Sequence, residues 1–211
     1  MRLHGFRAQM SYDLLTGWDL ESPATQARVL RGLACRRPKV VMLSSPCTPF
    51  SKLQNLSKGK RCPMKQAEQL ETGRELLRFS MRVAKMQLDR HDGFCHEHPT
   101  GASSWAEDCV QAVLNQPSVK LARFHQCMFG LKSKLRKSRH KEPTTLLTNV
   151  EHVVLRFGGV YCDKHQGEAH VQIHGREGGM RRSEYAQIYP EPLCKNLVAC
   201  FAAWLAETQQ G

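Results

Sequence analysis

Short apolar runs alternate with longer amphipathic segments along this chain of 211 residues. Such runs are typical of buried strands, and apolar positions spaced three or four residues apart are typical of helices. We expect strands over residues 6–12, 40–43, 119–124 and 145–148 and from residue 93 onward, with the clearest helix over residues 65–89. Alternation of strands and helices favours an α/β sheet with helices on both faces.

Capping residues indicate where several helices begin. Ser22 is suited to an N-cap, with Pro23 at the first helical position. Ser104 and Glu107 have the spacing of a capping box, which predicts a helix from this point. Asn149 is placed to cap a short helix that stops at the two glycines of positions 158 and 159.

The regularity of the pattern changes after residue 158. Residues 159–189 lack a clear period and hold many glycine, histidine and arginine residues, whereas Pro190 begins a final amphipathic helix. We therefore divide the chain into an α/β domain over residues 1–158, an irregular Cys/His-containing segment over 159–189, and a C-terminal helix over 190–211 that packs back on the domain.

The positive net charge of the chain indicates which kind of molecule it binds. The formal net charge is +12 and the pI is near 9.5, which favours DNA, RNA or another polyanion. No apolar stretch approaches the roughly 20 residues of a membrane span. The nine cysteines lack the paired spacing of a disulfide scaffold, so a reducing compartment, the nucleus or the cytoplasm, is expected.

A thiol and a carboxyl group follow two successive predicted strands. Cys47 lies in a turn rich in proline and serine directly after residues 40–43, and Glu97 lies at the end of the strand that begins at residue 93. Strand ends in α/β sheets are where ligands and reacting groups collect. A thiolate is a nucleophile and a desolvated carboxyl group can act as an acid. The alternative is a buried structural cysteine and a surface glutamate.

The segment Pro46-Cys47-Thr48-Pro49-Phe50-Ser51 resembles the catalytic loop of the cytosine-5 DNA methyltransferases, Pro-Pro-Cys-Gln-x-x-Ser. Glu97 falls where that family carries Glu-Asn-Val. The resemblance spans roughly residues 6–148 in order and spacing, and residues 141–149 with the Cys/His segment are similar to methyltransferase-like regions of retroelement polyproteins. It implies a Rossmann-like methyltransferase sheet.

The family's chemistry assigns a role to each matching residue. Cys47 would attack C6 of a flipped-out cytosine, and Glu97 would engage N3 of the ring. The C5 carbon would then accept a methyl group from S-adenosylmethionine. Asp13, Asp19 and Pro46 would bind this cofactor, Asp13 through the ribose hydroxyls and Asp19 at the adenine end, and Ser51 would contact the nucleic acid.

Several positions depart from the family pattern. Ser45 stands for the first proline, Thr48 for the glutamine, and His98 for the asparagine after the glutamate. No Gly-x-Gly turn precedes Asp13, although the family uses such a turn to hold the cofactor. We expect a sheet that lacks its first strand, an N-terminally truncated product, and weak or no cofactor binding.

A basic run lies between the two last predicted strands. Clustered lysine and arginine side chains neutralise phosphates and give salt-dependent binding without sequence preference. The alternatives are a solvated loop and a nuclear localisation signal. The residues are Lys132, Lys134, Arg136, Lys137, Arg139 and Lys141.

The irregular segment is rich in metal-ligand types. Cys162, His165, His170 and His174 are candidate ligands of a structural zinc ion, because thiolate and imidazole suit tetrahedral zinc. Their spacing is not that of a standard zinc finger, and Cys127 is a further candidate if the fold brings it near. A histidine-rich surface loop is the alternative.

Three functions are compatible with these patterns. The first is a DNA cytosine-5 methyltransferase-like enzyme, with inactivity left open by the departures from the family. The second is a non-catalytic, basic nucleic-acid-binding module of retroelement origin. The third is an RNA cytosine methyltransferase, since the same addition chemistry works on RNA.

Overall fold

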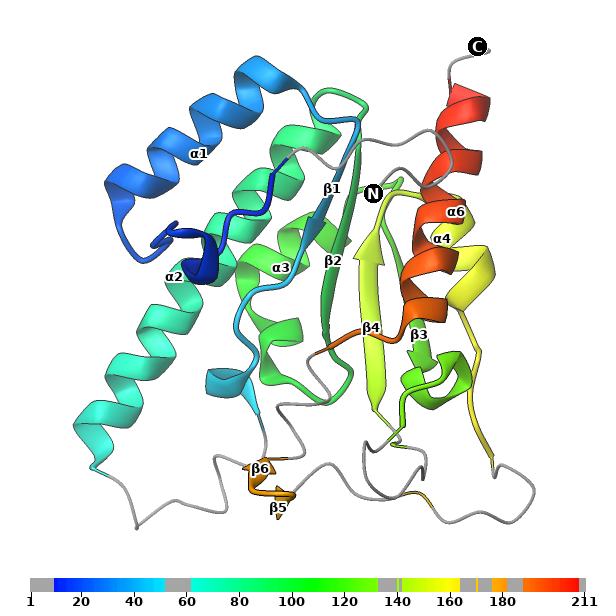
Figure 1. Ribbon diagram of the computed structural model, residues 1–211. Helices are drawn as coiled ribbons and strands as arrows, with labels where there is room; N and C mark the ends of the chain where they lie inside the picture. The colour runs from blue at the N-terminus through cyan, green and yellow to red at the C-terminus, as the bar shows by residue number, and fades with distance from the viewer. Residues whose placement is uncertain are drawn as a thin grey trace.

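A computed structural model describes residues 10–51, 62–132, 140, 142–163, 170, 176–181 and 188–208. Its centre is a four-stranded open sheet with the order β1-β2-β4-β3. The strands are β1 (Val40–Leu43), β2 (Gly93–Pro99), β3 (Lys120–His125) and β4 (Pro143–Thr148). β1 and β2 are parallel, whereas β4 runs antiparallel to both of its neighbours (Figure 1). A separate hairpin joins β5 (Arg176–Glu177) and β6 (Met180–Arg181).

Helices cover both faces of the sheet (Figure 1). α2 (Pro63–Leu88) and α3 (Asp108–Leu114) lie on one face, and α1 (Pro23–Arg36) packs on the outside of α2. α4 (Glu151–Phe157) and α6 (Glu191–Thr208) lie on the other face. Four 3-10 turns complete the described elements: η1 (Leu14–Thr16), η2 (Thr48–Phe50), η4 (Ser103–Ala106) and η5 (Gln126–Phe129).

Each face of the sheet has its own apolar core, because successive strand residues point to opposite sides. Leu147 packs with Leu77 of α2 on one face, and the adjacent Leu146 packs with Phe157 of α4 on the other. All four side chains are 1% exposed or less. Both faces are therefore closed by packed hydrocarbon, which leaves the strand ends as the places where polar groups can gather.

The α/β class predicted from the sequence is confirmed. β1 has the predicted bounds and β2 begins at the predicted Gly93. α1 begins at Pro23, with the Ser22 hydroxyl accepting a hydrogen bond from the backbone N–H of Thr25. The C-terminal helix packs against α4.

Two predicted helix caps are wrong. Ser104 lies within η4 and its hydroxyl bonds His98, while α3 begins later, after Glu107, without a side-chain cap. Asn149 does not cap α4, since its carboxamide accepts from the N–H of Phe94 and donates to the carbonyl of Asp92. In both cases a tertiary hydrogen bond outcompetes the local cap.

The first predicted strand is not seen in the part of the chain that the structure describes. Residues 1–9 lie outside the described ranges, and residues 10–12 form no strand. In the irregular segment, Val160 forms a parallel bridge with Phe124 at the end of β3. Within the described residues, no helix combines the length and the apolar character needed to cross a membrane.

Candidate functional site

Cys47 and Glu97 are brought to the same edge of the sheet. β1 and β2 are parallel neighbours with Leu43 opposite His96, so the chain leaving β1 runs beside the last residues of β2. Both carboxyl ends lie at the lower edge of the sheet in Figure 1. The Glu97 carboxylate is close enough to contribute to the raised pKa of the Cys47 thiol, after the larger effect of burial. Both side chains are half-buried rather than sealed in the core.

The turn that carries Cys47 is anchored on three sides. Cys47 precedes η2, and the Phe50 side chain at the end of that turn is 1% exposed in the core. The Ser103 hydroxyl donates to the Phe50 carbonyl at 3.3 Å. Pro49 packs on Gly73 of α2 so closely that a Cβ at this glycine would lie 2.8 Å from the proline Cγ. The position of the thiol is therefore fixed by packing.

His98 ties β2 to the same turn. Its Nε2 lies 2.9 Å from the Ser45 carbonyl oxygen, and its Nδ1 lies 2.6 Å from the Ser104 hydroxyl. Because a carbonyl only accepts, Nε2 carries the proton and Nδ1 accepts from Ser104. Burial lowers the pKa of His98 to about 4, which keeps the ring neutral. His98 thus positions the turn.

Glu97 points to the other face of the sheet from its histidine neighbours. His96 and His98 stack with ring centroids 5.2 Å apart beside Trp105, as strand alternation predicts. Glu97 accepts a hydrogen bond from the Tyr189 hydroxyl, which in turn lies 3.2 Å from the Ser44 hydroxyl. A chain of hydroxyl groups therefore leads to the carboxyl group.

A second carboxyl group, Glu142, faces the site. It immediately precedes β4, and because β4 is antiparallel to β2, its start lies beside the end of β2. Burial, and then the charge of Glu97, raise the pKa of Glu142 to about 7. Burial also raises the pKa of Glu97. Two neighbouring half-buried carboxyl groups favour the binding of one proton by the pair.

Burial and the neighbouring negative charges favour the protonated forms of the groups in this site, and so they disfavour the Cys47 thiolate. Burial, Glu97 and Glu142 all raise the pKa of Cys47, and only its own backbone N–H opposes them. Four cationic residues that follow Cys47 in the sequence could lower the pKa of a nearby thiol, but all four lie outside the described residues: Lys52, Lys58, Lys60 and Arg61. The described geometry therefore supports the acid role of Glu97 more strongly than the nucleophilic role of Cys47.

The predicted cofactor residues fall on exposed positions. Asp13 accepts from the Leu15 N–H at 2.8 Å and caps η1, and Asp19 accepts from the Glu21 N–H at 3.0 Å. Pro46 is exposed beside Cys47, and Ser51 follows η2. Since both carboxylates already cap their own turns, nothing in their geometry points to a bound ribose or adenine.

The basic run is described only at its edges. Lys132 is exposed, and the buried His140 joins the adjacent Leu131 through a backbone hydrogen bond of 3.1 Å. The other five predicted phosphate contacts, Lys134, Arg136, Lys137, Arg139 and Lys141, lie outside the described residues. Nucleic-acid contact by this run stays a prediction.

Two of the four predicted metal ligands lie close together, and Cys127, the further candidate, lies beside them. Cys162 and His170 meet Cys127 of η5, and the three ligand atoms lie within 4.8 Å of one another. His165 and His174 lie outside the described residues.

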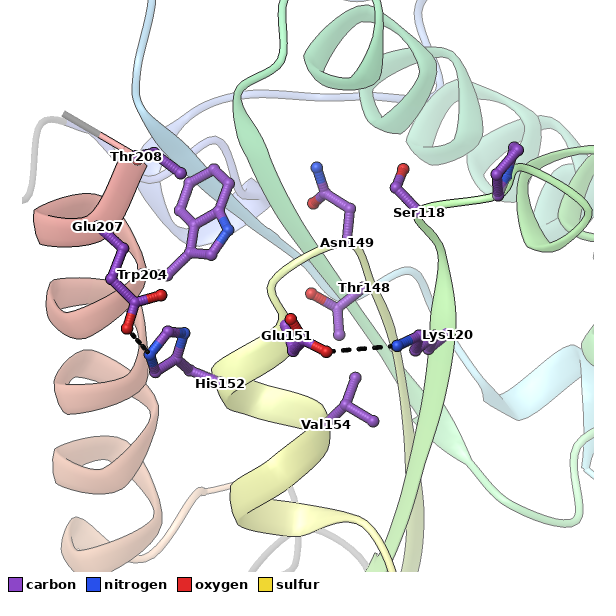
Figure 2. Close-up of a pocket in the computed structure, with 11 residues that line it drawn as sticks. Ser118, Lys120, Thr148, Asn149, Glu151, His152, Val154, Trp204, Glu207 and Thr208 are labelled. Carbon is purple, nitrogen blue, oxygen red and sulfur yellow. Dashed lines mark hydrogen bonds and ion pairs between the residues drawn. The ribbon is translucent and has the colours of Figure 1, made fainter. Parts of the chain in front are cut away.

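A pocket of about 280 Å³ lies at the opposite end of the sheet (Figure 2). Its polar walls are formed by paired charges, with Lys120 3.4 Å from Glu151 and His152 3.0 Å from Glu207. These pairs satisfy one another and lie away from the Cys47 turn. We therefore take the groups at the carboxyl ends of β1 and β2, and not this pocket, as the candidate functional site. This strand-end cluster consists of Ser44, Cys47, Glu97, Glu142 and Tyr189.

Three residues of the strand-end cluster, Glu142, Tyr189 and Ser44, were not predicted from the sequence. Glu142 could be found only by knowing that β4 pairs antiparallel with β2, and Tyr189 lies in the segment without a period. Ser44 had a signal, since it directly follows β1.

Comparison with protein-family models, with curated proteins and with solved structures finds no match to this chain. The assignment of function consequently depends on the chemistry of the site.

Proposed function

We propose that the chain is a DNA cytosine-5 methyltransferase-like protein with a Rossmann-like sheet, in which Cys47 adds to C6 of a cytosine and Glu97 protonates N3. The observation that carries this proposal is the placement of Cys47 and Glu97 at the carboxyl ends of two adjacent parallel strands. Such strand ends are the usual position of ligands in open α/β sheets.

The addition step uses one nucleophile and one proton. The sulfur electron pair of the Cys47 thiolate forms the S–C6 bond. The C5=C6 π electrons shift to form C4=C5, and the C4=N3 π electrons move onto N3, which takes the proton of Glu97. The product is a neutral enamine with a nucleophilic C5, and the raised pKa of Glu97 favours the protonated acid that supplies this proton.

The hydroxyl chain orients the acid. The Tyr189 hydroxyl donates to Glu97, which leaves the remaining carboxyl oxygen for the ring nitrogen. Glu142 supplies a neighbouring carboxyl group with a pKa of about 7, so a proton can be replaced after it is given up. Tyr189 and Glu142 are therefore positioning and proton-supplying groups, while Cys47 and Glu97 meet the base.

The thiol needs help to lose its proton. Its pKa is raised by burial and by Glu97, so passing the thiol proton to the Glu97 carboxylate would form the thiolate and at the same time remove the negative charge that opposes it. Protonation of Glu97 and ionisation of Cys47 are thus coupled in the direction that the addition requires.

Nucleic acid is the proposed partner because of the net charge of +12. A ring inside a duplex cannot reach a half-buried thiol, so the cytosine would be flipped out or taken from a single strand. We derive no step through S-adenosylmethionine, since Asp13 and Asp19 cap their own turns and do not fit it.

The addition can be tested without a cofactor. Reversible attack at C6 makes C5 basic, so a cytosine deuterated at C5 should exchange deuterium for solvent hydrogen. We expect exchange in a single-stranded DNA oligonucleotide incubated with the protein, measured by mass spectrometry, and its loss in Cys47→Ser and in Glu97→Gln. Cys194→Ser, which changes an exposed cysteine, is the matched control.

A non-catalytic nucleic-acid-binding module is the second candidate, favoured by the raised pKa of Cys47 and the positive net charge. It predicts salt-dependent DNA binding with no exchange at C5 in the native protein. Repeating the exchange with an RNA oligonucleotide separates the DNA enzyme from an RNA cytosine methyltransferase.

A further inference from the structure

The end of β3 holds a cluster of two cysteines and one histidine. Cys127 lies in η5, whereas Cys162 and His170 both come from the irregular segment that follows α4. Their ligand atoms lie within 4.8 Å of one another, and both cysteines are buried. Three soft or borderline ligands, one from η5 and two from the irregular segment, converge on one point, which surface histidine loops do not do.

The distances suit a metal ion. Two ligands of a tetrahedral zinc ion, at about 2.0–2.3 Å from the metal, lie roughly 3.5–3.8 Å apart. The Cys162 Sγ lies 3.5 Å from the His170 Nε2, which is this separation. The Cys127 Sγ lies within 4.8 Å of both of these atoms, so a small shift of its side chain brings it to the same separation.

The two cysteines are held in place by backbone bonds that do not involve their side chains. The Cys162 N–H donates to His125 Nδ1 at 2.9 Å, and the His125 N–H donates to the Val160 carbonyl at 3.0 Å. The Cys127 carbonyl accepts from Gly130 N–H at 3.3 Å. The site is thus built into the junction of β3 with residues 160–162, and its ligands need little reorganisation to bind.

We propose that Cys127, Cys162 and His170 bind one zinc ion through Sγ, Sγ and Nε2. Binding displaces the thiol protons, so the two sulfurs become thiolates bonded to the metal. Three ligands leave one coordination position, which water can fill. The ion would fasten the irregular segment, which leads on to Tyr189, to the end of β3.

Metal content tests the proposal. We expect the purified chain to hold about one zinc per molecule by mass spectrometry of the metal, and Co²⁺ exchanged into it to give thiolate-to-cobalt charge-transfer bands with intense visible bands of tetrahedral cobalt. Cys127→Ser, Cys162→Ser and His170→Gln should each weaken zinc binding by more than the roughly 10–100-fold that loss of an outer-shell partner causes. Cys194→Ser, at an exposed cysteine, should keep full metal content.

A readout on the native chain guards against variants that fail to fold. Zinc should protect Cys127 and Cys162 from alkylation by iodoacetamide, with peptide mass spectrometry as the measurement, and a chelator should remove that protection. The alkylation of Cys35 and Cys194 should not change. Absence of stoichiometric metal, equal metal content in Cys127→Ser and the control, or a mass two hydrogens lower from a Cys127–Cys162 disulfide would each overturn the proposal.

Discussion

The Nε2 of His98 lies 2.9 Å from the carbonyl oxygen of Ser45, so a side chain of β2 holds the backbone of the turn that presents Cys47. The residue after Glu97 therefore fixes the loop of the other candidate reacting group. This hydrogen bond explains how the short turn after β1 can hold the Cys47 thiol near Glu97, which lies at the end of β2.

His98→Ala should destabilise the fold. The change leaves the Ser45 carbonyl and the Ser104 hydroxyl without their partner and opens space in a packed region, which should lower the free energy of unfolding by about 2–4 kcal/mol. Urea unfolding at neutral pH is the measurement. His91→Asn is the control, because His91 is exposed with a positive φ that asparagine tolerates, and its effect should stay within about 0.5 kcal/mol.

Gly73→Ala should destabilise the protein despite the better helix propensity of alanine. The new Cβ would lie 2.8 and 2.9 Å from two atoms of the rigid Pro49 ring, so the turn or the helix must shift, at a cost of about 1–3 kcal/mol. The same shift should move Cys47 and reduce C5 exchange more than it reduces DNA binding.

Gly32→Ala provides the comparison for that substitution. Gly32 also lies inside a helix, but its Cβ would meet the ends of two flexible side chains, the Tyr12 hydroxyl at 3.3 Å and the Arg36 Nη1 at 3.8 Å. The free energy of unfolding should stay the same or rise by up to about 1 kcal/mol. Equal effects of the two substitutions in urea unfolding would contradict the packing role given to Gly73.

The elements with a strong local signal were predictable from the sequence. The apolar run of β1 and the Ser22-Pro23 start of α1 are determined by residues close together in the chain. The caps at Ser104 and Asn149 were predicted wrongly, because their polar groups bond to His98 and Phe94 of β2, and the helix-capping pattern does not reveal these bonds.

In the candidate site too, residues with a local signal could be predicted and residues placed by tertiary contacts could not. Cys47 and Glu97 could be proposed because each follows an apolar run, whereas Glu142 depends on an antiparallel pairing and Tyr189 on the path of an irregular segment. The raised pKa of Cys47 was not predicted either, since burial and the carboxyl neighbours are properties of the tertiary structure.

Acid should destabilise the protein through its buried histidines. The pKa of His98 falls from 6.5 to about 4 on folding, so its contribution is complete above pH 6.5 and is lost as the pH falls toward 4. Between these values one proton is taken up on unfolding, which lowers the free energy of unfolding by about 1.4 kcal/mol per pH unit. In His98→Gln this dependence, measured by urea unfolding from pH 7 to 5, should be shallower by about that amount.

Glu142→Gln should change the pH dependence of stability. Relative to the native protein, the variant should become more stable as the pH rises from acid to alkaline values. The pKa of Glu142 rises from 4.5 to about 7 on folding, so its stabilising contribution is complete below pH 4.5 and is lost as the pH rises through 7. Glutamine stays neutral and avoids this loss. The difference in unfolding free energy between variant and native protein should therefore move by about 1–2 kcal/mol in favour of the variant between pH 4.5 and 8. An unchanged difference across this range would show that Glu142 is solvated.

Glu97→Gln should make Cys47 more reactive toward iodoacetamide. Only the thiolate reacts, and the Glu97 charge is the second cause, after burial, of the raised pKa of this thiol. Removing the charge should lower the pH at which Cys47 reacts at half its maximal rate and increase the rate at pH 7.5 several-fold. Glu142→Gln should act in the same direction but less, because its contribution is smaller. Peptide mass spectrometry resolves Cys47 from the exposed Cys194, whose rate should stay constant and report any general loosening of the fold. A Cys47 pH–rate profile identical in native protein and Glu97→Gln would separate the two groups and remove the basis for a shared site.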